Sequence, residues 1–435
     1  MTPSPAAAAA ESRVDDSLIA SLRGLDRNGR LLFATRILRM FGYGFLAVVL
    51  VLYLSAIGLD AGPIGLILTL TLLGDTLISL WLTTHADRIG RRLVLIVGSL
   101  LMVAAAIVFA STDIFIVLVI AGAIGVISPT GNEVGPFLAV EQAALSQSMP
   151  DVRRTPTFAW YNLVGYVATA LGALAAGLIS QILIADGFAA VDAYRAVVIG
   201  YAVIGILMAI LFRKVGPEAE APPQARTDVS IGRRLGLGER SRAIILRLSA
   251  LFALDAFGGG FIPQSLMAYW FHVRFGVEPA VLGAIFFGAN LLAAVSSLSA
   301  SRIASRIGLV NTMVFTHLPS NVLLILVPLM PTLPLAVLVL LLRFSLSQMD
   351  VPTRQSYVIS VVEPDERSAA AGVTGIARTT GAAISPALSA PLVANTGLAG
   401  LPFVLAGGLK IVYDLLLYRA YTSGQAPDER AVDRA

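Results

Sequence analysis

Long apolar stretches, separated by short polar segments, make up most of this chain. An α-helix rises about 1.5 Å per residue, so about 20 apolar residues cross the roughly 30 Å hydrocarbon core of a bilayer. Stretches of this length follow one another from Leu31 to Tyr421. The pattern predicts an all-α membrane protein with twelve transmembrane helices, at residues 31–57, 62–84, 93–111, 114–145, 156–183, 193–213, 246–270, 279–300, 309–331, 333–361, 369–394 and 399–420.

One polar segment, residues 214–245, is longer than the others and separates the sixth predicted helix from the seventh. Its run Gly216–Pro223 contains only Gly, Pro, Glu and Ala, a composition that cannot bury a core. We therefore expect a cytoplasmic linker between two six-helix bundles. The predicted organisation is a tail with a short interfacial helix at 1–30, a bundle at 31–213, the linker at 214–245, a second bundle at 246–421 and a tail at 422–435.

The two predicted bundles resemble each other in sequence. A shift of 218 residues places Gly42 on Gly260 and Asp60 on Glu278, and it places the run Arg88–Gly90 on Arg306–Gly308. Shared Gly and Leu are common among apolar sequences, but charged positions in matching loops are not explained in that way. The repeat predicts two pseudo-symmetric halves, an arrangement typical of secondary transporters.

Arginines in the polar segments predict the orientation in the membrane. If both termini face the cytoplasm, the outer side holds only Arg195 and Arg274. The inner side then holds most of the basic residues, namely Arg88, Arg91, Arg92, Arg153, Arg154, Lys214, Arg226, Arg233, Arg234, Arg240, Arg242, Arg306 and Arg367. This bias follows the positive-inside rule. The Ala-rich, polar start of the chain predicts no removable signal.

Composition narrows the function classes. The chain is 57% hydrophobic and 13% charged, with a mean hydropathy of +0.82, so lipid is its main solvent. It has no cysteine and only three scattered histidines, which predicts no metal site and no cofactor. No phosphate-binding G-x-x-x-x-G-K-[ST] motif occurs. The net charge of +4 is spread over short loops, which indicates contact with anionic lipid rather than nucleic acid.

The segment between the second and third predicted helices carries a recognisable motif. It reads Thr83-Thr84-His85-Ala86-Asp87-Arg88-Ile89-Gly90-Arg91-Arg92. This run resembles the G-x-L-a-D-R-x-G-R-[RK] loop of the major facilitator superfamily, with Thr83 in place of the first Gly and His85 in place of the Leu. The resemblance implies a twelve-helix carrier whose halves rock around a central cavity.

The same loop predicts a conformational latch. Arg91 and Arg92 can bind lipid phosphate at the cytoplasmic interface, and Asp87 can pair with an arginine. Glu141, near the inner end of the fourth helix, is the expected acidic partner. We predict that the charges of Asp87, Arg91 and Glu141 hold the outward-facing state, with Arg88, Gly90 and Arg92 completing the motif. The alternative is interfacial charge that only sets topology.

Ionised side chains inside the hydrocarbon region point to function, because each is costly unless it faces water or a partner. We predict a substrate and proton pathway formed by Glu133, Asp255, Arg343, Asp350 and Arg378, with Arg39 and Asp75 as further members. The resemblance implies that helices 1, 4, 7 and 10 line the cavity. The alternative is a set of fixed ion pairs, Arg343–Asp350 or Asp350–Arg354, and Lys410 and Asp414 can pair in the same way on the last helix.

The fourth predicted helix contains the run Ser128–Phe137, which has two prolines and two glycines around Glu133. Proline and glycine free backbone groups that polar side chains or water must then satisfy. We therefore expect a break in this helix at the level of a binding or gating site.

These features predict a secondary transporter for a small organic solute, with protons and membrane lipids as further partners, and not an enzyme. The run Arg39–Gly44 resembles bacterial efflux-type members, which favours a monomeric proton-driven exporter in the bacterial cytoplasmic membrane. The fifth helix lacks the Gly-Pro pair of drug/proton antiporters, so uptake of a metabolite or organic anion stays open. A membrane sensor or enzyme is a third possibility, but the sequence has no catalytic constellation to support it.

Overall fold

The computed structural model describes residues 25–422, apart from 148, 150, 221–237 and 364–365. The described residues form helices joined by short connections. These helices are α2 (Arg27–Ala56), α3 (Ala61–Ile89), α4 (Arg91–Ser111), α5 (Phe115–Ile124), α6 (Phe137–Gln147), α7 (Asp151–Ala185), α8 (Ala190–Arg213), η1 (Pro217–Ala219), α9 (Glu239–Gly260), α10 (Gln264–Phe275), α11 (Pro279–Ile307), α12 (Leu309–Leu326), η4 (Val327–Leu329), α13 (Leu333–Leu346), α14 (Asp350–Ser360), α15 (Arg367–Ala394) and α16 (Leu401–Thr422).

Each of the twelve predicted spans coincides with one helix or with two consecutive ones, so the all-α class is confirmed. Ten helical segments among the described residues are long and apolar enough to cross a membrane. The other two spans are interrupted or less apolar: the fourth is divided between α5 and α6, and the eleventh is α15. Long apolar runs therefore predict where the chain crosses the membrane, whereas Pro and Gly determine where a membrane-spanning helix is interrupted.

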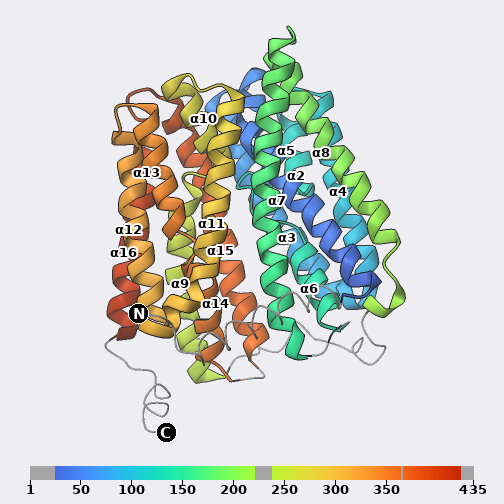
Figure 1. Ribbon diagram of the computed structural model, residues 1–435, viewed down its shortest axis with the longest axis vertical. Helices are drawn as coiled ribbons and strands as arrows, with labels where there is room; N and C mark the ends of the chain where they lie inside the picture. Colours follow the sequence, from blue (N-terminus) through green and yellow to red (C-terminus); the bar gives the residue numbers. More distant parts are fainter. Residues whose placement is uncertain (1–24, 148, 150, 221–237, 364–365, 423–435) are drawn as a thin grey trace, which may run out of the picture.

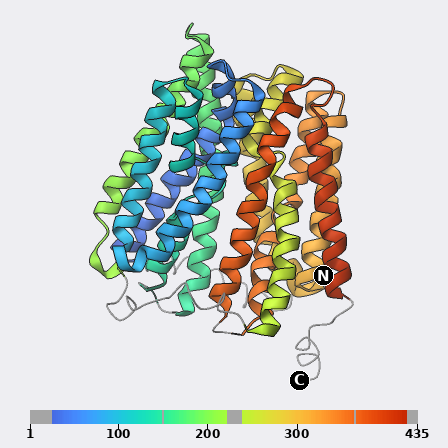
Figure 2. The ribbon, with the colours of Figure 1, turned by 180° about the vertical axis from the view of Figure 1, so that it is seen from behind.

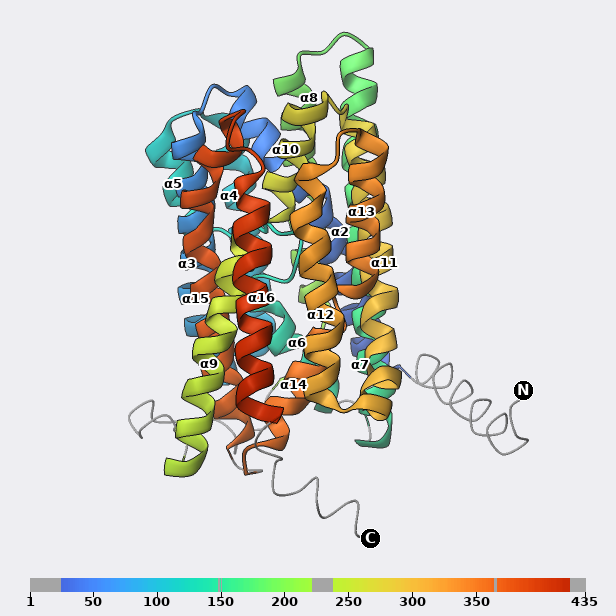
Figure 3. The ribbon, with the colours of Figure 1, turned by 90° about the vertical axis from the view of Figure 1, so that its left-hand side faces the viewer.

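The helices divide into two sets that lie side by side in two opposite views (Figures 1 and 2). One set contains α2–α8 and the other contains α9–α16. Seen from the side of the second set, α9, α12, α13 and α16 lie in front of α2 and α6 (Figure 3). We call the end at which α2 begins and α16 ends, lower in Figure 1, the proximal end, and the opposite end the distal end.

The two sets touch through backbone at the distal end. A Cβ atom at Gly177 of α7 would lie 2.3 Å from the carbonyl oxygen of Pro279, and one at Gly65 of α3 would lie 2.7 Å from that of Pro386. Only glycine permits such close approach of helices. Near the second contact, the backbone N–H of Ala387 donates to the hydroxyl of Thr69 at 3.0 Å.

Helices α2, α7 and α9 begin four to seven residues before the expected boundaries. Helix α2 begins at Arg27, where the carboxylate of Asp26 accepts a 2.6 Å hydrogen bond from Gly29 and caps the helix. Helix α9 begins at Glu239, seven residues before the expected start. Its first turn is polar, and a polar composition predicts a linker rather than a membrane-spanning helix. The expected interfacial helix and most of the linker lie outside the described residues.

Candidate functional site

The fourth crossing is interrupted at mid-depth, as its prolines and glycines predicted. Helix α5 ends at Ile124 and α6 begins only at Phe137. Between them, Gly131 and Gly135 adopt φ values of +70° and +79°, which favour glycine. The carboxylate of Asp75 on α3 accepts the N–H of Gly135 at 2.7 Å, so a side chain replaces a missing helical hydrogen bond.

The interruption places Glu133 against two arginines of α2. Glu133 is ion-paired with Arg36, and its other oxygen lies 2.8 Å from Nε of Arg39. Arg39 also donates two hydrogen bonds of 2.6 Å to the carboxylate of Glu141. These four side chains are called the N-terminal charge cluster below. Two arginines and two carboxylates balance each other, which offsets the cost of burial.

Glu141 is not the partner of Asp87 and Arg91 in this structure. Its side chain is fully buried and accepts hydrogen bonds from Arg39, Tyr161 and Thr35. A buried carboxylate requires a cation at the same depth, and Arg39 on α2 supplies it. Asp87 and Arg91 do pair with each other, at 2.8 Å, beside the proximal end.

The segment after η1 binds the loop between α3 and α4, a contact that the sequence did not predict. Gly90 joins the two helices with φ +111°. The carboxylate of Glu220, just after η1, accepts the backbone N–H groups of Arg91 at 2.6 Å and Arg92 at 3.1 Å. It therefore caps the start of α4. Arg88 lies in the last turn of α3.

A second cluster lies at mid-depth among α9, α14, α15 and α16. Asp255 is 2.7 Å from Nζ of Lys410 and 2.9 Å from Nη1 of Arg378. Arg354 is 2.5 Å from Asp350 and 3.7 Å from Asp255. These five side chains are called the C-terminal charge cluster. The fixed pair Asp350–Arg354, proposed as a structural alternative, is present, and it is part of this larger network.

The C-terminal charge cluster continues into a group that the sequence did not suggest. Nδ1 of His317 on α12 lies 2.8 Å from a carboxylate oxygen of Asp414 on α16. Asn321 donates to the other oxygen of Asp414 at 2.9 Å. The expected pair of Lys410 with Asp414 is therefore wrong. Lys410 binds Asp255 of α9, whereas Asp414 binds His317 and Asn321 of α12. The sequence signal that could have indicated this group is His317, a polar residue in the middle of the apolar span that forms α12.

Arg343 remains apart from this network. Its guanidinium carbon lies 4.8 Å from the ring centre of Phe344. Its Nε is buried without a hydrogen-bond partner, and no carboxylate of the described residues is within ion-pair distance. The alternative pair Arg343–Asp350 is therefore not formed, because Asp350 is bound by Arg354.

Comparison with known proteins identifies the family. The model of the Major Facilitator Superfamily matches residues 32–386. The chain belongs to the major facilitator superfamily. An uncharacterized membrane protein of Saccharomyces cerevisiae is 30% identical, over 94% of this chain and 97% of its own length.

Solved structures agree on the fold of this major facilitator. A bacterial homologue of the human lysosomal transporter Spinster, in an inward-facing and unoccupied conformation, aligns with a TM-score of 0.69 and 15% identity, over 93% of this chain and all of that chain. The nucleoside transporter NupG aligns with a TM-score of 0.68 and 14% identity, over 91% and 99%. These identities support the fold alone. With the family match, they make the chain a transporter and not an enzyme.

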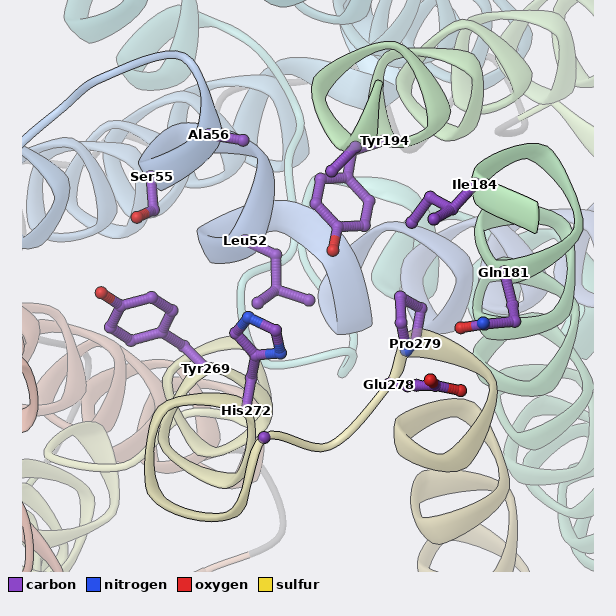
Figure 4. Close-up of a pocket in the computed structure, with 12 residues that line it drawn as sticks. Leu52, Ser55, Ala56, Gln181, Ile184, Tyr194, Tyr269, His272, Glu278 and Pro279 are labelled. Carbon is purple, nitrogen blue, oxygen red and sulfur yellow. The ribbon is translucent and has the colours of Figure 1, made fainter. Parts of the chain in front are cut away.

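This major facilitator has a cavity of about 350 Å³ between its two halves at the distal end. Figure 4 shows Tyr194, Gln181 and Leu52 of the first half facing His272 and Glu278 of the second. None of the predicted pathway residues lines it. The cavity therefore marks the seam that must part when the distal end opens, and the two charge clusters lie deeper.

Proposed function

We propose that this major facilitator moves a small organic solute by alternating access and that protons move in the same cycle. The observation that carries the proposal is the pair of charge clusters at mid-depth, each with one member that is partly exposed. The side chain of Glu133 is 19% exposed and that of Arg378 is 31% exposed. Ionised groups persist in a membrane where they serve a solute or ion pathway. Asp75, which has no cation partner among the described residues, belongs to the same pathway.

We place the proximal end in the cytoplasm. Arg88, Arg91, Arg92 and Arg306 lie there, as the positive-inside rule requires of cytoplasmic loops. The glycine contacts close the distal end, which is then the outer side of the carrier. The resemblance of the run Arg39–Gly44 to efflux-type members supports a bacterial cytoplasmic membrane, although the curated relative is a yeast protein. The monomer remains our expectation for the assembly.

Two directions of transport are candidates. The resemblance of Arg39–Gly44 supports export. In the structure, however, Arg39 binds Glu133 and Glu141 and Tyr43 donates to the carbonyl of Val134, so this run also holds the broken fourth crossing. The second candidate is proton-coupled uptake of an organic anion, and the partly exposed Arg378 supports an anion as the solute.

Reconstitution tests the proposal. The purified chain is placed in vesicles that contain a pH-sensitive dye, and uptake and efflux of a panel of labelled organic anions and cations are followed with and without a pH gradient. We expect flux of at least one compound to rise roughly tenfold with the gradient and to stop when nigericin collapses it. Flux that is the same with and without the pH gradient would refute proton coupling. Vesicles without the protein give the background.

A further inference from the structure

Four side chains form a series that runs from a partly exposed group to a buried one. Arg378 lies 2.9 Å from Asp255, Asp255 lies 3.8 Å from Nε2 of His317, and Nδ1 of His317 lies 2.8 Å from Asp414. Their side chains are 31%, 2%, 5% and 0% exposed, in that order. The series therefore connects accessible space beside α15 to the interior of the second half.

The accessible end of the series opens beside α15. Gly375, which precedes Arg378 by about one turn, has no neighbouring atom within 4 Å of the position of a Cβ. A guanidinium that faced lipid would be costly, so this open side of α15 is where water and solute reach Arg378. A solute at this place would meet a cation before it met any other charge of the cluster.

The buried end of the series fixes the proton on one nitrogen of His317. An ionised Asp414 only accepts hydrogen bonds, and Asn321 already donates to one of its oxygens. Nδ1 of His317 is closer to the carboxylate of Asp414, at 2.8 Å, than to the amide nitrogen of Asn321, at 3.2 Å, so we assign its proton to the hydrogen bond with Asp414. Nε2 is then the unprotonated nitrogen on the side of Asp255. A second proton on Nε2 would turn it into a donor toward Asp255.

The charges around His317 are balanced while its ring is neutral. The ionisable groups of this network on the surrounding helices are Asp255 of α9, Asp350 and Arg354 of α14, Arg378 of α15, and Lys410, Tyr413 and Asp414 of α16. Three carboxylates, Asp255, Asp350 and Asp414, oppose three cations, Arg354, Arg378 and Lys410. One proton on His317 leaves an excess positive charge, which an anion near Arg378 would offset.

We propose that the carrier binds an organic carboxylate at Arg378 and a proton at Nε2 of His317, and that each stabilises the other. This inference rests on the proposed proton coupling and names the proton acceptor and the class of solute. The solute carboxylate takes the place of Asp255 on Arg378. Asp255 then accepts a hydrogen bond from the protonated His317 and keeps Lys410. Because coupling between two sites is reciprocal, solute and proton cross together.

The protonation of His317 can be observed directly, because the chain has only three histidines. In the background His85→Gln with His272→Gln, the nitrogen resonances of labelled histidine report His317 alone. We expect the neutral form of the ring to carry its proton on Nδ1 in the absence of solute. Benzoate, acetate or succinate should increase the charged fraction, and benzylamine should not. If none of the three carboxylates changes the charged fraction of His317, the proposal is contradicted.

The reciprocal measurement uses binding of the same probes to the unmodified chain. At least one carboxylate should bind roughly tenfold more tightly at pH 6 than at pH 8. His317→Gln, which keeps a hydrogen bond to Asp414, should remove that pH dependence, and Arg378→Gln should weaken binding more than Arg378→Lys. Equal affinity at both pH values in the unmodified chain overturns the inference without reference to any variant.

Failure of the inference and failure of the proposed function are distinguishable. If His317 stays neutral from pH 5 to pH 8 while protons still accompany solute in vesicles, the acceptor is another group and proton coupling stands. If solute moves with no proton, the proposed function itself is wrong.

Discussion

Two glutamates of the N-terminal charge cluster have different surroundings. Glu141 is fully buried, with both oxygens bound by Arg39, whereas Glu133 sits on an irregular segment and is partly exposed. A buried carboxylate whose charge is removed leaves its cation without compensation, while a partly exposed one can be replaced by water. Arg39 therefore has a fully buried partner, Glu141, whose charge it needs, and a partly exposed partner, Glu133, that water can replace.

This contrast predicts a difference in stability between two matched variants. Glu141→Gln should lower the free energy of unfolding by about 3–5 kcal/mol, because Arg39 is left buried with too little negative charge. Glu133→Gln should cost clearly less. Thermal unfolding of the purified variants in detergent measures both, and equal losses would show that Glu141 has no special role in holding Arg39.

The depth of the charged residues could be predicted from sequence, but their partners could not. Asp255 and Arg378 were singled out because they fall in the middle of apolar spans, and the structure pairs them. Lys410 was assigned to Asp414 by helical spacing, yet it binds Asp255, because the rotation of each helix about its axis decides which side chains meet. Local spacing carries no information on that rotation.

At the scale of helices, both ends of the segment between α8 and α9 are held by carboxylates. Glu220 binds the start of α4, and Glu366, beside the start of α15, accepts hydrogen bonds from Ser241 and from the N–H of Gly238 at the start of α9. The donated hydrogen bonds of Ser241 and Gly238 hold the pKa of Glu366 below its usual value. Each half thus binds its own end of the linker.

The lowered pKa of Glu366 predicts acid sensitivity of the start of α9. A carboxylate whose pKa falls on folding stabilises the folded form above its unfolded pKa of about 4.3, and this contribution is lost as the pH falls through the folded value. A spin label on Arg242→Cys, in a chain without other cysteines, should become mobile below about pH 4. Glu366→Gln should be mobile already at pH 7, whereas the exposed Glu363→Gln should behave as the parent; a label equally ordered in all three would contradict the role of Glu366.

The interruption of the fourth crossing was predictable, but the extension of α9 was not. Prolines and glycines at Ser128–Phe137 have a direct backbone consequence, so the break followed from residue type. The first turn of α9 is polar and resembles a linker by composition. The residue before this turn, Gly238, donates its N–H to Glu366, which lies more than 120 residues later in the chain.

On the scale of the whole molecule, glycine contacts close the distal seam. A Cβ at Gly283 of α11 would lie 2.8 Å from the carbonyl oxygen of Ala173 and 3.1 Å from Cα of Gly177. These residues belong to different halves and are distant in sequence, so the sequence did not predict their contact. Any larger side chain there must hold the halves apart.

Gly283→Leu should therefore shift the carrier toward the distal-open state. A cysteine at Gln181, which lines the distal cavity, should react with a polar maleimide at least tenfold faster in this background, equivalent to about 1.4 kcal/mol. Gly372→Leu is the matched control, because its position faces open space. Unchanged labelling in Gly283→Leu would show that the glycine contact does not govern distal closure.

The balance of positive and negative side chains within the molecule affects how a membrane potential acts on it. The N-terminal charge cluster carries two cations and two carboxylates, and the C-terminal charge cluster together with the neighbouring Asp414 carries three of each. Asp75 and Arg343, which lie outside the clusters, have opposite charges. A voltage supplies about 2.3 kcal/mol per 100 mV only to a charge that crosses the field. The empty carrier should therefore reorient at the same rate in polarised and depolarised vesicles. The electrical part of the proton-motive force then does almost no work on that step.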